Sequence, residues 1–372
     1  MAQNMNSYMP VRVYTGAGCV RQNEGEFKKA GTKALLVTGR HSAKACGAYQ
    51  DVAETLDACG IGFALFDGIG QNPLLTDCMK AAELAIAGRC DFVIGIGGGS
   101  PLDAAKCIAV LAANPGMTKE ELYSLVWPEK PLPVIAVGTT AGTGSEVTKV
   151  AVITTPNGRK SSFRHDDIYP VAAFGDPLYT HSLPMEFTIS TAIDAFSHSM
   201  ESYFSRLANE ISRCYAVQGI RIALPVLEKL ALGAAELSAE DRETLYHASI
   251  YGGMAINVTG TCLPHAMGYL LTEQHGLPHG FACAMFLPEF LSINERIRPE
   301  LAEAFLAAIG YGSEELTALL SKLLKDVHVT IDEEEIVREH GRWINNGSIA
   351  KGWGEITADM CDEILRKLGG VR

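Results

Sequence analysis

The strongest constraint on the fold of this chain is a regular alternation of short apolar runs with helical stretches over its first half. Four runs have the length and apolar composition of buried strands, namely KALLVT (33–38), FALF (63–66), DFVIGI (91–96) and LPVIAV (132–137). Helical patterns follow the first three runs, from Ser42 to about Ala58, from Leu74 to Ala87 and from Pro101 onward. Such repetition predicts a parallel α/β sheet with right-handed crossovers.

The second half of the chain has a different pattern. The change occurs around FGDPLYTHSLP (174–184), and from Met185 onward the sequence is rich in Ala and Leu with a helical period. A length of 372 residues also exceeds what one hydrophobic core usually supports. We therefore expect an α/β domain with a parallel sheet over residues 1–180 and an all-α domain over residues 181–372.

Composition excludes several classes of protein. Hydrophobic residues make up 47% and charged residues 20% of the chain, as in a globular enzyme, and the net charge of −12 argues against nucleic acid or membrane partners. The N-terminus lacks a signal-peptide pattern, and no apolar run approaches the roughly 20 residues that span a bilayer. The ten cysteines are scattered without a CxxC pair, which is typical of a reducing compartment. These features predict a cytoplasmic enzyme.

A glycine-rich turn lies between the third predicted strand and the helix after it. In IGIGGGSPLDAAK, Gly97, Gly98 and Gly99 precede Ser100. Glycines let backbone N–H groups converge on an anion, and the start of the following helix adds its positive dipole end. The GxxxxGK[ST] order is absent, and the turn departs from GxGxxG because Ser100 stands where the last glycine is required. It predicts a pyrophosphate site, with a plain tight turn as the alternative.

A second loop with glycine and threonine, TTAGTGSEVT (139–148), follows the fourth predicted strand directly. Its hydroxyls and free backbone groups suit the ribose and nicotinamide half of a dinucleotide. Asp103, in the helix after the glycine turn, is a candidate acceptor for a carboxamide. The alternative for Asp103 is a charge that stabilises the first turn of its helix.

The second half contains a candidate metal site. Asp194 and His198 are four residues apart and so share one face of a predicted helix, and His265 and His279 bracket a segment with Gly and Pro turns. One carboxylate and three imidazoles suit a divalent transition ion such as iron or zinc. The alternative is that each histidine is an ordinary core or surface residue.

The segments GGGSPLDAAK, TTAGTGSEVT, DAFSHSMES, HAMGY and GLPHG occur in this order. With them the chain resembles the iron-containing alcohol dehydrogenase family, from the first strand to about residue 300. That family is similar in fold to dehydroquinate synthase and glycerol dehydrogenase. The resemblance implies a Rossmann-like domain, an all-helical domain, and hydride transfer between a small alcohol or aldehyde and NAD(P). It also implies one Fe²⁺ or Zn²⁺ in the cleft between the domains, and a homodimer or higher homo-oligomer.

The family's site residues transfer to individual positions of this chain. The metal ligands fall on Asp194, His198, His265 and His279, and the pyrophosphate loop falls on Gly97, Gly98, Gly99 and Ser100. Further positions that line the cofactor cleft fall on Thr139, Thr140, Thr143, Lys160 and Leu178.

One departure from the family pattern concerns the adenosine ribose. Many NAD-using members carry an Asp just after the first βα strand, where it binds the ribose hydroxyls, whereas this chain has Gly39. The missing acid removes repulsion against a 2′-phosphate, and Arg40 and Ser42 are in position to contact one. We therefore expect NADP(H) to be preferred over NAD(H).

Two further departures lie in the second half. Members often have a second His four residues after the ligand at His265, but this chain has Tyr269. A neutral imidazole is a better proton relay than a phenol, so His275 is predicted to take this role, with Tyr269 or a water chain as the alternative. The segment INNGSIAKGWGEIT (344–357) lacks the Asn-Pro-Arg element common in the family, which leaves the substrate open.

Two other functions compete with the dehydrogenase. A metal-dependent lyase of the dehydroquinate synthase type needs Lys and Arg residues around its metal, but only Arg206 and Arg213 are near the predicted ligands in sequence. A non-catalytic dinucleotide-binding protein would not require all four ligand positions. The dehydrogenase is therefore the favoured interpretation.

Overall fold

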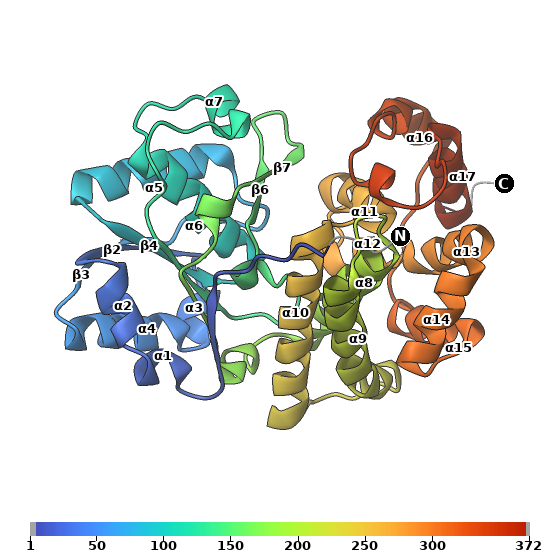
Figure 1. Cartoon of the computed structure of the whole chain (residues 1–372), viewed down its shortest axis with the longest axis horizontal. Helices are drawn as coiled ribbons and strands as arrows, with labels where there is room; N and C mark the ends of the chain where they lie inside the picture. The colour runs from blue at the N-terminus through green and yellow to red at the C-terminus, as the bar shows by residue number, and fades with distance from the viewer. Residues whose placement is uncertain (1–4, 370–372) are drawn as a thin grey trace. The chain divides into compact units, whose positions relative to one another are not determined.

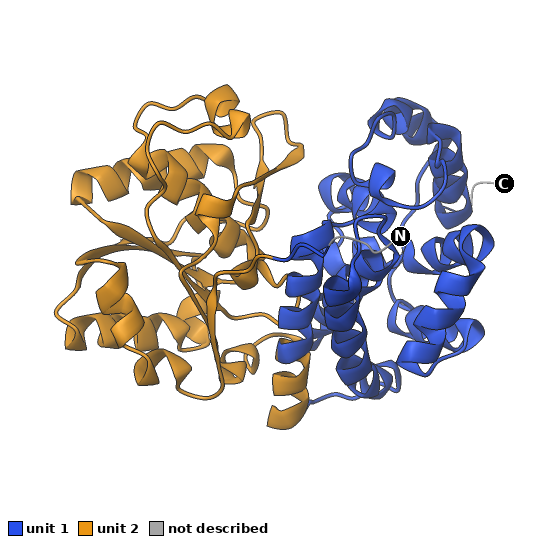
Figure 2. Ribbon diagram, in the orientation of Figure 1, with its two compact units in different colours: residues 1–7, 185–237, 247–372 blue, residues 8–184, 238–246 orange. Residues whose placement is uncertain are grey.

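The computed structural model describes residues 5–369, which form two compact units (Figure 2). The sheet unit comprises residues 8–184 and 238–246, and the helical unit comprises the other described residues. The long switch between the units lies at Pro184 and Met185, a few residues beyond the position 180 expected from the sequence. Two short segments depart from this simple division, because residues 5–7 belong to the helical unit and residues 238–246 belong to the sheet unit. The sequence pattern does not indicate either segment.

A parallel sheet of six strands forms the centre of the sheet unit. The strands are β1 (Arg12–Thr15), β2 (Lys33–Thr38), β3 (Gly62–Phe66), β4 (Phe92–Gly97), β5 (Val134–Gly138) and β8 (Ala172–Gly175), in the order β1-β8-β5-β4-β2-β3. All neighbours pair in parallel. A separate antiparallel hairpin consists of β6 (Val150–Thr154) and β7 (Lys160–Arg164). The predicted parallel α/β sheet is confirmed, although the sequence analysis missed β1, β8 and the hairpin.

Helices cover both faces of this sheet (Figure 1). Successive side chains of a strand point to opposite faces, and in β2 Leu35 and Val37 belong to one core whereas Ala34 and Leu36 belong to the other. The first core packs against α5 (Leu75–Gly88) and α6 (Gly99–Ala113). The second packs against α1 (Cys19–Gln22), α2 (Gly25–Ala30) and α4 (Ala48–Ala58). Strands buried on both faces explain the continuous apolar runs in the sequence.

Short elements complete the sheet unit. They are the helices α3 (Ser42–Ala45) and α7 (Lys119–Ser124) and the 3-10 turns η1 (Ser145–Val147), η2 (Asp166–Ile168) and η3 (Pro177–Thr180). The helix expected from Ser42 to Ala58 is therefore two helices. Gly47 separates them with a φ of 87°, a left-handed conformation that glycine adopts readily.

The helical unit contains no strand among its described residues. Its helices are α8 (Met185–Phe204), α9 (Glu210–Ala231), α10 (Ala239–Thr259), α11 (Leu263–Gln274), α12 (His279–Ala284), α13 (Leu287–Ile297), α14 (Pro299–Ile309), α15 (Ser313–Leu323), α16 (Glu333–Glu339) and α17 (Ala358–Gly369), with 3-10 turns η4 (His340–Arg342) and η5 (Ile349–Lys351). The expected all-helical second half is confirmed. Within residues 5–369 no helix combines the length and the apolarity that a bilayer crossing needs.

One segment of α10 belongs to the core of the sheet unit. Tyr246 is fully buried, and its hydroxyl donates to Glu146 Oε1 at 2.7 Å. A Cβ on Gly138 would lie 2.2 Å from this hydroxyl oxygen, and a Cβ on Gly175 would lie 2.0 Å from the Tyr246 ring. The ends of β5 and β8 are therefore shaped to receive a side chain from much later in the sequence.

Candidate active site

One face of helix α8 carries three polar residues of the candidate metal site, two carboxylates and one imidazole. Asp194, His198 and Glu201 are spaced by four and three residues, and such positions share a helix face. They are 3%, 5% and 0% exposed. Buried charged groups need a partner or an ion, so this face of α8 has a polar function that the core alone does not explain.

The two other predicted ligands come from the starts of two helices in the same unit. His265 lies in the first turn of α11, after Pro264, and His279 begins α12 directly after Pro278. His265 Nε2 lies 3.5 Å and His198 Nε2 lies 3.8 Å from Asp194 Oδ1. The rings of His265 and His279 have centroids 5.2 Å apart. Asp194, His265 and His279 therefore lie close together, and Cys283 joins them. His198 lies beside Asp194 but is not part of this closest group, so its role as a ligand stays a prediction.

Two atoms of this cluster test whether an ion would fit. Asp194 Oδ1 and His265 Nε2 are buried and have no hydrogen-bond partner. Ligand atoms of Asp194, His265, His279 and Cys283 all lie within 4.8 Å of one another, a separation that one central ion with bonds of about 2.0–2.3 Å can bridge. Leaving two buried polar atoms unsatisfied costs free energy, so the residues present fit a divalent metal.

The electrostatics of the cluster also suit a cation. Burial would raise the pKa of Asp194, but His198, His265 and His279 hold it well below its usual range. Burial would lower the pKa of His265, but Cys283, Glu201 and Asp194 raise it above its usual value. Asp194 is consequently ionised near neutral pH and supplies a fixed negative charge to the site.

Two residues of the cluster were missed by the sequence analysis. Glu201 Oε1 lies 2.5 Å from His265 Nδ1, and the Cys283 Sγ lies 3.7 Å from both ring nitrogens of His279. Their spacings on the two helices, seven residues after Asp194 and four after His279, were available as signals. Glutamates and cysteines at helical spacing are too common for that signal to stand out.

Close packing of α12 brings His279 and Cys283 to the cluster. A Cβ on Gly280 would lie 1.8 Å from Ser190 O of α8 and 3.0 Å from Asp194 Cβ. A Cβ on Gly268 of α11 would lie 2.8 Å from Cys283 Sγ. Only glycine allows these helices to approach so closely, so both glycines position metal-site residues.

The two predicted cofactor loops lie side by side in the sheet unit, because β4 and β5 are neighbours. Thr139 N donates to Gly97 O at 2.9 Å. A Cβ on Gly98 would meet Thr140 Cγ2 at 3.1 Å, and one on Gly99 would meet Thr143 Cγ2 at 2.8 Å. Gly99 and Ser100 begin α6, so their N–H groups have no helical acceptor and are available to an anion.

Other predicted cofactor residues surround these loops. Ser100 Oγ accepts from Asn72 N at 3.2 Å. Asp103 accepts from Ser145 Oγ at 2.5 Å and from Val152 N at 3.0 Å, and it interacts electrostatically with Lys160 of β7. These bonds occupy part of the acceptor capacity of Asp103, so its binding of a carboxamide stays a prediction.

The residues predicted at the adenosine end of the cofactor, and Leu178 of the predicted cofactor cleft, are accessible. Arg40 and Ser42 are exposed just after β2, next to Gly39. Leu178, in η3, is 49% exposed, and its N–H donates to Asp176 at 2.9 Å. An exposed leucine side chain is available for contact with the apolar part of a ligand.

The two candidates for proton relay lie in different surroundings. The ring of Tyr269 stacks on His279 with centroids 5.4 Å apart and meets His265 edge-on at 6.4 Å. His275, at the end of α11, instead has its Nε2 2.8 Å from Glu335 Oε1 of α16. Contact with the predicted ligands therefore favours Tyr269, whereas His275 is engaged by a carboxylate.

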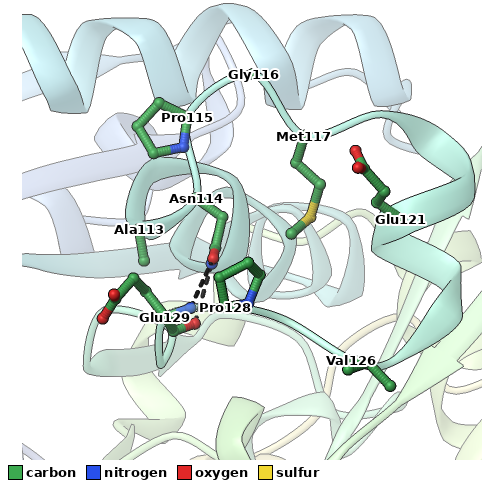
Figure 3. A pocket seen from close by; sticks show the side chains of 9 residues that line it. All are labelled: Ala113, Asn114, Pro115, Gly116, Met117, Glu121, Val126, Pro128 and Glu129. Atoms are coloured by element: carbon green, nitrogen blue, oxygen red, sulfur yellow. Dashed lines mark hydrogen bonds between the residues drawn. The ribbon is translucent and has the colours of Figure 1, made fainter.

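A separate pocket of about 360 Å³ lies beside the end of α6 and α7 (Figure 3). Asn114 fixes its wall by exchanging two hydrogen bonds with the backbone of Glu129, at 2.9 and 3.0 Å. None of the residues that line it belongs to the predicted cofactor or metal set. It is therefore distinct from the candidate active site.

Comparison with known proteins agrees with this geometry. A family model described as "Iron-containing alcohol dehydrogenase" matches residues 10–177, and one described as "Fe-containing alcohol dehydrogenase family, C-terminal" matches residues 188–341. Alcohol dehydrogenase 4 of Schizosaccharomyces pombe is 32% identical over 313 residues, which cover 84% of this chain and 74% of the relative.

Two solved structures are similar over almost the whole chain. An iron-containing alcohol dehydrogenase from Thermotoga maritima has a TM-score of 0.90 at 34% identity, with 98% of this chain and 99% of that chain covered. A sulfoacetaldehyde reductase from Bifidobacterium kashiwanohense in complex with NAD+ has a TM-score of 0.87 at 27% identity, with both chains fully covered. These likenesses support an NAD-linked alcohol dehydrogenase and do not favour the lyase or the non-catalytic alternative. This chain belongs to the iron-containing alcohol dehydrogenase family.

Proposed function

We propose that this chain transfers hydride between NADP(H) and a small alcohol or aldehyde, with one divalent metal ion held by Asp194, His198, His265 and His279. Members of the family use NAD(H) or a related nicotinamide together with iron or another divalent ion. The observation that carries the proposal is the buried pair of Asp194 Oδ1 and His265 Nε2, which have no hydrogen-bond partner. An ion bound there would supply Lewis-acid polarisation of the substrate oxygen, while the nicotinamide would supply or accept the hydride.

The residues of the chain would bind and orient these groups. Three imidazoles in their neutral form and one carboxylate would leave a bound divalent ion with a net positive charge, which would attract an electron-rich oxygen. In the sheet unit, the N–H groups that begin α6 would bind a pyrophosphate, and Thr139, Thr140 and Thr143 would fix the other half of the cofactor. The chemistry therefore depends on positioning and electrostatics, without a nucleophilic side chain.

Metal content of the His265→Ala and His279→Ala variants tests the ligand assignment. Each variant loses one imidazole, so we expect it to bind the ion far more weakly and to lose dehydrogenase activity. The control is His247→Ala, which alters a histidine outside the cluster. Full metal occupancy with unchanged activity in both ligand variants would refute the assignment.

The preference for NADP(H) rests on Gly39, Arg40 and Ser42. A Cβ on Gly39 would lie no closer than 3.4 Å to Ile69 O, so an aspartate can be introduced at this position with little overlap. Gly39→Asp should shift the ratio of kcat/KM toward NADH, because its carboxylate would repel a 2′-phosphate and accept from the ribose hydroxyls. Gly39→Asn is the matched control of the same shape without the charge. An original protein that uses NADH at least as well as NADPH would contradict the preference.

The prediction that His275 is the proton relay can be tested by comparing variants of His275 with variants of Tyr269. Rates measured across pH for His275→Ala and Tyr269→Phe separate the two residues, since only the relay residue should change the pH profile while the metal is retained. An unchanged profile in His275→Ala would remove His275 from the relay. The contacts of Tyr269 with His265 and His279 support Tyr269 as the replacement.

The proposal also includes a cytoplasmic location and a homodimer or higher homo-oligomer. All ten cysteines are free thiols, which supports a reducing compartment. The family resemblance supports the oligomer. Cell fractionation tests the location, and light scattering of the purified chain tests the oligomeric state.

A further inference from the structure

We infer that Glu201 is a positioning residue that determines which nitrogen of His265 faces the metal ion and so sets the affinity of the site. The inference rests on the metal site proposed above. It adds a residue that neither binds the ion nor touches the substrate, and that acts only through His265.

The contacts of Glu201 fix its carboxylate in one orientation. Oε1 accepts from Ser197 Oγ at 2.7 Å and lies 2.5 Å from His265 Nδ1. Oε2 accepts from Cys262 N at 2.6 Å and from His265 N at 3.4 Å. The side chain is fully buried. The carboxylate therefore ties α8 to the N-terminal end of α11, where backbone N–H groups and the helix dipole favour a negative charge.

This geometry assigns the two nitrogens of His265 to different tasks. A carboxylate can only accept hydrogen bonds, so Nδ1 must carry the proton of the short contact with Glu201. In the neutral ring that binds a metal, Nε2 is then the nitrogen with a free lone pair. It is the atom that lies 3.5 Å from Asp194 Oδ1 with no hydrogen-bond partner. Metal-binding histidines commonly use such an outer carboxylate to fix ring orientation and raise ligand basicity.

Glu201→Gln is the sharpest variant because it keeps the shape of the side chain. The amide has one acceptor oxygen and one donor nitrogen, whereas all the protein groups around Glu201 donate. If the oxygen faces Cys262 N, the NH₂ group faces Nδ1 and favours the tautomer that carries the proton on Nε2. That tautomer cannot ligate through Nε2.

The experiment measures Zn²⁺ affinity by competition with a chelator for the original protein, Glu201→Gln and Glu201→Asp. We expect Glu201→Gln to lose about 10–100-fold in affinity and Glu201→Asp to recover part of the loss. The control is Glu335→Gln, which alters another carboxylate–histidine pair, the partly buried one with His275, outside the metal cluster. This control should keep its Zn²⁺ affinity. Glu201→Gln with an affinity within about threefold of the original protein would overturn the inference.

A second measurement needs no variant and so remains decisive if Glu201→Gln fails to fold. In Zn²⁺-loaded protein labelled with ¹⁵N-histidine, His265 should show a deshielded, slowly exchanging proton on Nδ1 and no proton on Nε2. Ligation of His265 through Nδ1 would overturn the role of Glu201 while leaving the metal site intact. An original protein that binds no Zn²⁺, in contrast, would refute the proposed function itself.

Discussion

Gly99 sets how closely the two predicted cofactor loops approach each other. In Gly99→Ala the new methyl group would lie 2.8 Å from Thr143 Cγ2, so the loops must separate. We expect a rise in the dissociation constant for the nucleotide of about tenfold, equivalent to about 1.4 kcal/mol, with little change in metal content. Isothermal titration with NADPH measures the effect.

A double variant checks the cause of that loss. Thr143→Ser removes Cγ2 but keeps the hydroxyl that accepts from Ser145 N, so Gly99→Ala combined with Thr143→Ser should recover most of the affinity. If the double variant binds as weakly as Gly99→Ala, steric contact with Thr143 is not the cause.

Candidate site residues with a continuous local signature can be picked out from the sequence, and their roles stay predictions. The glycine turn before α6 and the i, i+4 pair of Asp194 and His198 depend on neighbours in the chain. Of the ligands that the motifs name, the structure brings Asp194, His265 and His279 close together. Glu201 and Cys283 were not predictable, because their roles depend on the crossing of α8 with α11 and of α12 with α11. Only tertiary packing reveals which of many buried polar residues faces a ligand.

At the scale of the elements, the position of α12 depends closely on Gly280. Gly280→Ala would place a methyl group 1.8 Å from Ser190 O of α8, and α12 would have to move away with His279. Overpacking of this kind destabilises by about 1–3 kcal/mol, and metal affinity should fall as well. Thermal unfolding with Zn²⁺ and with a chelator measures both effects.

Gly347→Ala is the matched control, because a Cβ there would meet nothing within 4 Å. It should leave both unfolding temperatures unchanged. A Gly280→Ala variant whose unfolding temperature responds to Zn²⁺ as strongly as that of the original protein would show that α12 can shift without loss of the site.

Elements were predicted well where their composition was distinctive. The apolar runs of β2 and β4 are strands because they are buried on both faces of the sheet. β8 is only AAFG, which has no β-branched residue, and β1 is RVYT. Each strand has four residues, too few for it to stand out in the sequence. β1 pairs with β8, and β8 pairs with β5, through backbone hydrogen bonds that form only when the sheet assembles. The sequence of either strand alone does not specify this pairing.

At the scale of the whole molecule, the two proposed ligands should stabilise different parts of the chain. Hydrogen exchange should slow in residues 97–100 and 139–148 when NADPH is added, and in residues 190–201 and 262–283 when Zn²⁺ is added. A ligand at 100 times its dissociation constant adds about 2.7 kcal/mol to the free energy of opening, which slows exchange about 100-fold. Mass spectrometry of peptic fragments measures the rates.

The two halves of this prediction can fail separately. Protection of residues 97–100 by Zn²⁺ alone, in the absence of nucleotide, would contradict the assignment of the two ligands to the two units. Addition of Ca²⁺ provides the control for ionic strength, because a site of three imidazoles and one carboxylate binds this hard ion weakly.

The Tyr246 side chain has a consequence for how the protein is made. A ribosome synthesises the chain from its N-terminus, so all strands of the sheet emerge long before Tyr246 does. Until then the space beside Gly138 and Gly175 lacks the ring that fills it, and Glu146 lacks its bond to the tyrosine hydroxyl. The nascent sheet unit therefore stays incompletely packed while some sixty further residues, from Pro184 to Tyr246, are translated. A chain truncated after Pro184 would lack Tyr246 and so could not complete the core of this unit.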